Sequence, residues 1–176
     1  MKLAKVFKEN KQFTLFSILA LVVVGVAVFA PQIAPYDPLD AVMLESLQAP
    51  SSAHPFGTDK LGRDLLSRVI FGTRTSLIMT LCLVAVIFVI GTFLGVIAGY
   101  FGGIVDGVIM RIADMMISFP GLVLAIAIAG MLGPNLVNAV ISIAAVSWTK
   151  YARLARSMVL RLSLIHISEP TRLRRI

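Results

Sequence analysis

The chain consists of long apolar stretches separated by short charged segments. Asp, Glu, Lys and Arg are absent from three stretches: residues 12–36, 75–105 and 115–149. A helix that crosses a bilayer needs about 20 apolar residues, so the first two stretches predict one membrane span each. The third is interrupted by the turn signal Leu132-Gly133-Pro134-Asn135, and it predicts two spans, near residues 108–131 and 136–155.

The span at 136–155 depends on the placement of its charged end. Its uncharged part is short, so it crosses the membrane only if Lys150, Arg153 and Arg156 extend their charged groups to the interface. A re-entrant segment is the alternative. The whole pattern predicts an all-α membrane protein with about four transmembrane helices.

Composition excludes an ordinary water-soluble domain. Hydrophobic residues make up 58% of the chain and charged residues 14%, compared with roughly 45–50% and about 25% in soluble domains. The net charge of +7 reflects basic residues clustered before the first span and after Trp148. Because Lys and Arg are retained in the cytoplasm, we expect a cytoplasmic N-terminus and no nucleic-acid partner. The first apolar run is too long for a typical signal peptide, which is the alternative.

The segment at 35–74 is expected to lie outside the cytoplasm. Within residues 56–72, apolar side chains recur at helical spacing on one side, and opposite charges stand four residues apart on the other. This pattern predicts an amphipathic helix on the outer membrane face, capped by Thr58 or Asp59.

Small residues recur every fourth position in the second and third predicted spans. They are Gly91, Gly95 and Gly99, and then Gly121, Ala125 and Ala129. Small residues at this spacing let another helix approach closely, so both sets predict helix-packing stripes. Gly102 and Gly103 are expected in the turn between the two spans. The alternative is that glycine and alanine are simply common in membrane helices.

Two charges lie near the start of the third span. Arg111 and Asp114 are three residues apart, on adjacent helical turns, and are predicted to pair with each other. A role in the transport path is the alternative, because an ionised side chain within the bilayer costs about 2.5–3.5 kcal/mol on insertion scales. Pro120 is predicted to act as a hinge in this helix, since proline removes a backbone donor.

No catalytic motif is found. The sequence has no G-x-x-x-x-G-K-[ST] phosphate loop, no H-E-x-x-H and no G-x-S-x-G elbow. Cys82 is the only cysteine, and His54 and His166 are far apart in the predicted topology. We therefore expect no internal disulfide, metal site or bound cofactor, and no enzymatic activity of the chain itself.

Three segments carry a resemblance to a known family: HPFGTDKLGRDLLSRVIFGTRTSL, GVIAGYFGGIVDGVIMRIADMMISFPGLVLAIAIAGMLGP and WTKYARLARSMVL. They resemble the permease subunit of bacterial ABC importers for dipeptides, oligopeptides or nickel. The loop motif is similar to that of the second of the two paired permeases. The resemblance runs from the first span to about Leu160.

The resemblance implies the N-terminal part of a binding-protein-dependent ABC permease fold in the bacterial inner membrane. The chain would form half of a path for peptides or nickel, together with a second permease, two cytoplasmic ATPase subunits that use ATP, and an extracytoplasmic binding protein. The outer loop would supply contacts to the binding protein or the partner permease, with Phe56, Asp59, Arg63, Asp64 and Arg68 as candidates. A small self-associating membrane scaffold or pore subunit without an ATPase is the alternative function.

Residues 162–176 follow a different pattern. In the family, the segment after YARLARSMVL continues into a cytoplasmic loop with a Glu-Ala-Ala motif, whereas this chain has LSLIHISEPTRLRRI. Glu169-Pro170 is expected to end the helix, and residues 162–172 resemble a translated transposon-end sequencing adapter. We expect a fragment truncated before that loop, with a foreign tail. A genuine basic tail on the inner membrane surface is the alternative.

The predicted organisation has five parts. They are a cytoplasmic N-terminus (1–11), a first transmembrane helix (12–34), an extracytoplasmic loop with the amphipathic helix (35–74), an incomplete permease domain of three helices (75–161) and the foreign or artefactual tail (162–176).

Overall fold

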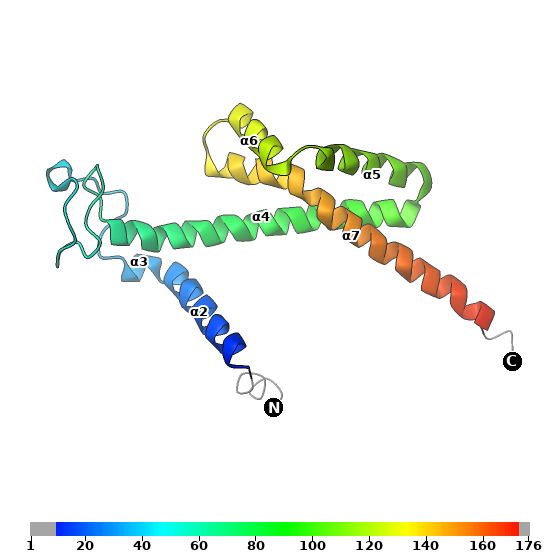
Figure 1. Cartoon of the computed structure of the whole chain (residues 1–176), viewed down its shortest axis with the longest axis horizontal. Helices are drawn as coiled ribbons and strands as arrows, with labels where there is room; N and C mark the ends of the chain where they lie inside the picture. Colours follow the sequence, from blue (N-terminus) through cyan, green and yellow to red (C-terminus); the bar gives the residue numbers. More distant parts are fainter. Residues whose placement is uncertain (1–9, 173–176) are drawn as a thin grey trace. The chain divides into compact units, whose positions relative to one another are not determined.

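A computed structural model describes residues 10–172, with side chains as far as Leu162 (Figure 1). Within this range the chain forms helices joined by loops, with one isolated β-bridge and no strand. The predicted all-α membrane fold is therefore confirmed. The chain divides into two compact units, Met1–Ile78 and Met79–Ile176.

The first unit contains two helices before its loop and the start of a third after it. They are α2 (Lys11–Val28), α3 (Ala30–Ile33) and the beginning of α4 (Leu65–Phe101), with a 3-10 turn, η1 (Met43–Glu45), in the loop. α2 is apolar around its whole circumference, and nearly all of its side chains are exposed. Such a helix is suited to lipid rather than to water.

Two glycines fold the loop at residues 34–64. Gly57 and Gly62 have positive φ angles of 76° and 75°. A β-carbon on these glycines would lie 2.4 Å and 1.8 Å, respectively, from carbonyl oxygens of the 42–48 segment. Only glycine permits both this backbone conformation and this close approach, so the pair brings the second half of the loop against the first.

The amphipathic helix predicted within residues 56–72 is wrong for its first half. Residues 56–64 form turns closed by an antiparallel bridge between Thr58 and Asp64, and the helix begins only at Leu65. The left-handed backbone of the two loop glycines is incompatible with a helix there. The apolar spacing that suggested an independent helix belongs partly to α4.

Asp64 caps α4, in place of the predicted Thr58 or Asp59. Its Oδ2 accepts a hydrogen bond from the Ser67 amide at 2.7 Å. This is the bond that an N-cap carboxylate makes to the third residue of a helix, where backbone donors have no partner within the helix.

The second unit contains the rest of α4, followed by α5 (Gly103–Ser118), α6 (Gly121–Leu132) and α7 (Leu136–Arg172). The turn predicted at Gly102 and Gly103 is present, with φ angles of 61° and 52°. α6 folds back along the first part of α7 (Figure 1). The buried apolar residues of the unit are mostly alanines, which suits close helix packing.

The turn between α6 and α7 lies where the sequence predicted it. Gly133 has a φ of 91°, and Asn135 caps α7 by accepting a hydrogen bond from the Val137 amide at 2.9 Å. The Asn138 side chain donates to the carbonyl oxygen of Leu132 at 2.7 Å. These bonds satisfy backbone groups that the two helix ends leave open.

Membrane spans can be assigned by length and composition within the described residues. α2 and α4 qualify individually, and α5 with α6 would make a third if this pair, bent by 93°, is one broken span. α7 contains the predicted fourth span but does not qualify, because Asn138, Lys150 and Arg153 interrupt its apolar run. The count of about four is therefore approximate, with two or three supported here.

The expectation that Glu169-Pro170 ends the last helix is wrong. α7 continues through this dipeptide as far as Arg172. A proline removes its own amide donor, but the neighbouring residues can keep helical backbone angles.

Candidate functional site

Four polar residues form a buried group in the first unit, which we call the loop cluster: His54, Thr58, Asp64 and Ser67. Their exposed fractions are only 6%, 5%, 3% and 0%. Among the described residues, every buried side-chain nitrogen or oxygen has a hydrogen-bond partner. The loop cluster is therefore a fully satisfied polar core, which holds a single conformation because an unpaired buried group is costly.

His54 lies between two carboxylates at the centre of the loop cluster. Its Nδ1 is 3.0 Å from Asp64 Oδ1, and its Nε2 is 3.4 Å from Glu45 Oε2. The Tyr36 ring covers the imidazole at a centroid distance of 4.9 Å. His54 thus connects η1, the segment after α3 and the residue that caps α4, a role for which no sequence pattern is a signal.

Asp64 has the largest number of partners in the loop cluster. Its Oδ2 accepts the amide and the hydroxyl hydrogens of Ser67, both at 2.7 Å, and the Ser67 hydroxyl oxygen accepts the Tyr36 amide at 3.1 Å. Burial raises the pKa of the Asp64 carboxyl, but the hydrogen bonds from Ser67 and His54 outweigh burial and lower the pKa below its ordinary value.

Asp59 organises the exposed side of the same loop. Its Oδ1 accepts the amides of Leu61 and Arg63 at 2.8 Å and 3.1 Å, and its Oδ2 pairs with the guanidinium groups of Arg63 and Arg68. Desolvation raises the pKa of Asp59, but these hydrogen bonds and the charge of Arg63 lower the pKa to about 2. The hydrogen bonds of Asp59 therefore stabilise the backbone conformation of the loop.

The five predicted contact residues of the loop separate into two groups. Asp59, Arg63, Asp64 and Arg68 are engaged within the loop itself, whereas Phe56 is 54% exposed. The charged part of the FGTDKLGRD motif therefore has a structural explanation.

The second candidate site is the contact of α4 with α7, which we call the glycine seam and define as Gly91, Gly95 and Gly99. A β-carbon at Gly91 would lie 2.6 Å from the Trp148 carbonyl oxygen, and one at Gly95 would lie 2.2 Å from that of Ala152. At Gly99 it would lie 2.9 Å from the β-carbon of Val159. Since two of these obstacles are backbone atoms, α7 could not approach so closely with any other residue there.

The second small-residue stripe packs more loosely. A β-carbon on Gly121 would make an ordinary contact with Val146 at 3.4 Å. Ala125 is 7% exposed, and Ala129 is only half-buried. These positions lie on α6, which packs on α7.

The predicted pairing of Arg111 with Asp114 is wrong. Asp114 pairs with Arg153 on α7. Asp106, near the start of α5, accepts hydrogen bonds from two guanidinium nitrogens of Arg156. Asp106 and Asp114 lie toward α7, whereas Arg111 projects elsewhere, so the helix packing selects the partner. An Asp106 without a local partner in a membrane segment was a signal that the sequence analysis missed.

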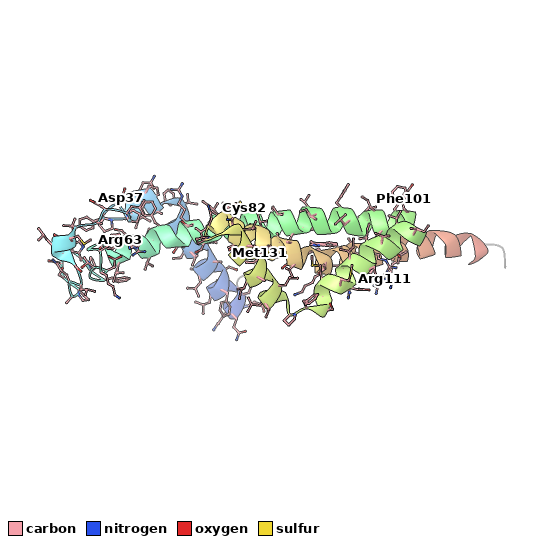
Figure 2. The ribbon with its side chains drawn as sticks, turned by 90° about the horizontal axis from the view of Figure 1, so that it is seen from above. Asp37, Arg63, Cys82, Phe101, Arg111 and Met131 are labelled. Atoms are coloured by element: carbon pink, nitrogen blue, oxygen red, sulfur yellow. The ribbon has the colours of Figure 1, made fainter. Side chains whose placement is uncertain are left out.

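Pro120, the predicted hinge within one helix, lies between α5 and α6. The directions of the two helices differ by 93° there. The chain therefore forms two separate helices at this point rather than one kinked helix. The elbow borders a partly open cavity of about 370 Å³ among α5, α6 and α7, with Phe119, Leu122, Val146 and Lys150 among its lining residues. Figure 2 shows the side chains of these helices around the elbow. No cluster of metal-ligating side chains occurs among residues that the structure describes.

Two protein-family models match the chain. Residues 91–163 match the binding-protein-dependent transport system inner membrane component, and residues 2–50 match the N-terminal transmembrane domain of oligopeptide transport permease C. The chain is similar to this permease family over these two segments. The family description and the apolar helices indicate an integral protein of the inner membrane.

Curated relatives show the same similarity. The chain is 39% identical over 160 residues to a dipeptide transport system permease protein of Haemophilus influenzae, covering 88% of the chain and 54% of the relative. It is 40% identical over 153 residues to a glutathione transport system permease protein of Pectobacterium atrosepticum, covering 86% and 51%. A nickel transport system permease protein of Escherichia coli (strain K12) is 41% identical over 128 residues, covering 73% and 46%. The chain thus spans about half the length of the curated relatives it matches.

The glycine seam should not tolerate a side chain. We expect Gly95→Val to lower the thermal unfolding midpoint in detergent, with a loss of about 1–3 kcal/mol in the free energy of unfolding, because the new β-carbon collides with the backbone of α7. Gly130→Val on α6 is the matched control, since no atom lies within 4 Å of its β-carbon position. Equal unfolding midpoints for the two variants would contradict the seam.

The loop at residues 34–64 should lose stability at low pH. The folded-state pKa of Asp59 is about 2 and that of Asp64 is also lowered. Their contribution is therefore complete above the ordinary carboxyl pKa of about 4 and declines as pH falls toward about 2. We expect amide protection at Leu61 and Arg63, measured by hydrogen exchange and corrected for intrinsic rates, to decline over this window. Asp59→Asn should flatten most of the decline, and constant protection in the unsubstituted chain down to pH 2 would contradict the assignment.

Proposed function

We propose that this chain is a transmembrane permease subunit of an ATP-driven importer for peptides, and that it forms half of the translocation path with a partner permease. The observation that carries the proposal is the similarity of 86–88% of the chain to permeases named for dipeptide and glutathione transport. Nickel is the alternative cargo, and the nickel permease matches a smaller share of the chain, 73%.

The helix contacts join α4, α5 and α6 to α7. The glycine seam joins α4 to α7, and the pairs Asp106–Arg156 and Asp114–Arg153 join α5 to α7. α6 is bounded by the break at Pro120 and the turn at Gly133. We propose that α4, α5 and α7 move as one body, with α6 carried along by its packing on α7, when the path opens and closes.

The energy for transport is proposed to come from other subunits. The sequence has no G-x-x-x-x-G-K-[ST] phosphate loop, so ATP would be bound and hydrolysed by two cytoplasmic ATPase subunits. An extracytoplasmic binding protein would deliver the peptide, in keeping with the family description. The clusters of Lys and Arg before the first span and after Trp148 favour a cytoplasmic N-terminus.

The loop is proposed to contribute to docking through its apolar side chains. Arg63 and Arg68 both form ion pairs with Asp59. Phe56 is the predicted contact residue with an exposed apolar side chain, and it would contact the binding protein or the partner permease.

Deletion of the gene in its source organism should abolish uptake of a labelled dipeptide at micromolar concentration, and a plasmid copy should restore it. Asp106→Asn should restore it poorly, because the change leaves Arg156 without its charged partner in a membrane helix. Asp40→Asn is the matched control, since Asp40 is exposed in the loop and makes no side-chain bond that the structure describes.

Three results would contradict the proposal. Unchanged dipeptide uptake in the deletion strain would contradict the peptide importer, and loss of nickel uptake alone would assign the other cargo. Ion conduction by the purified chain in lipid bilayers without any ATPase would favour the scaffold or pore subunit.

A further inference from the structure

Two carboxylates of the loop face the two ring nitrogens of His54. Asp64 Oδ1 lies 3.0 Å from Nδ1, and Glu45 Oε2 lies 3.4 Å from Nε2. An ionised carboxylate, the usual form near neutral pH, can accept hydrogen bonds but cannot donate them. Each ring nitrogen of His54 therefore faces an acceptor.

This arrangement fits one charge state of the imidazole better than the other. A neutral histidine has one N–H group, and its other ring nitrogen is itself an acceptor. A neutral ring would thus direct a lone pair at one of the two negative charges, although His54 is only 6% exposed. An imidazolium ring carries a proton on both nitrogens and matches both carboxylates.

The loop holds the two carboxylates to different degrees. The side chain of Asp64 is 1% exposed, and its second oxygen accepts two hydrogen bonds from Ser67. The side chain of Glu45 is 43% exposed, and His54 is its ion-pair partner among residues 10–162. Glu45 can therefore turn into water when its partner loses a charge, whereas Asp64 stays in place.

We propose that His54, Glu45 and Asp64 form a pH-operated latch, which holds η1 against the loop cluster while His54 is an imidazolium and releases η1 when Nε2 loses its proton. The remaining proton stays on Nδ1, because Asp64 is the closer and more buried carboxylate. The lone pair of Nε2 then faces Glu45, and the ion pair is lost. The latch is thus closed at low pH and opens as pH rises.

The other groups around the ring carry no charge that could replace this one. Tyr36 stacks on the imidazole, and a tyrosine is neutral near pH 7. Asp59 pairs with Arg63 and Arg68 on the exposed side of the loop. Histidine is the side chain that changes its charge near neutral pH, so the latch responds to the pH of the compartment that contains the loop.

His54 also fixes the turn that carries Phe56. Its carbonyl oxygen accepts the amides of Ser51 and Gly57, both at 2.9 Å. The turn therefore stays with Asp64 while η1 is released, and the shape of the loop around the proposed docking residue changes with pH. This consequence rests on the proposed function, whereas the latch requires only the folded loop and can be tested without transport.

Nitrogen NMR of the full chain in phosphatidylcholine nanodiscs, with isotope-labelled histidine, tests the charge state. Signals that are absent from His54→Gln belong to His54. We expect protons on both ring nitrogens at about pH 6 and the loss of the Nε2 proton alone as pH is raised to about 9. A neutral ring at the lower pH, or loss of the proton from Nδ1, would overturn the latch.

Replacement of Glu45 tests its part in the latch. Glu45→Gln should lower the midpoint of the proton loss by about one pH unit, because an opposite charge nearby favours the imidazolium. Asp40→Asn is the matched control, since Asp40 is an exposed carboxylate of the same loop. If the two variants have the same midpoint, Glu45 is not the partner of Nε2 and the proposal is wrong.

Hydrogen exchange, corrected for intrinsic rates, tests the release of η1. The Leu47 amide, just after η1, donates across the loop to the Asp59 carbonyl oxygen at 3.1 Å. Its protection should fall about tenfold as His54 loses its proton, because a charge-assisted contact is lost. The amides of Leu61 and Arg63, which Asp59 accepts, should stay protected and show that the loop remains folded. Unchanged protection at Leu47, or an equal fall at all three amides, would contradict a local release of η1.

Discussion

Helices in lipid associate only when their backbones can approach closely, because burial from water does not drive them together. The contact of α4 with α7 at Gly91, Gly95 and Gly99 meets this condition, with carbonyl oxygens of α7 in the space where β-carbons would otherwise lie. Once α7 lies against α4, its arginines come within reach of α5. The two Asp–Arg pairs and the position of α6 therefore depend on the glycine seam.

The loop follows a different principle, because its conformation is set by polar groups. His54, Thr58, Asp64 and Ser67 are buried with all their hydrogen bonds made, and two glycines bring the two halves of the loop together. A motif that resembles a permease signature thus has a direct physical explanation: its glycines and carboxylates build a loop of fixed shape at the start of a membrane helix. A fixed shape lowers the entropic cost of binding another protein.

The sequence predicted contacts that depend on spacing along one helix and failed where the partner lies on another. Gly91, Gly95 and Gly99 could be found because a period of four marks one face of a helix. Asp114 was assigned to Arg111, three residues away, because its true partner is 39 residues distant and only the packing of α7 brings it near. Asp64 looked like one member of a charged helical face, and the positive φ of two glycines made it a helix cap instead.

The central claim, that the glycine seam joins α4 to α7, is tested most directly by one cross-link within the chain. In a Cys82→Ala background, Gly99→Cys with Val159→Cys should form an intramolecular disulfide in membranes, because the two β-carbon positions lie 2.9 Å apart and need to move apart only slightly to reach the separation of about 3.5–4.5 Å found in disulfides. Phe101→Cys with Val159→Cys is the control, since Phe101 lies about 200° around α4 from Gly99 and is 67% exposed. A strong disulfide in the first pair alone is the predicted result, and equal or absent disulfide formation in the two pairs would contradict the account.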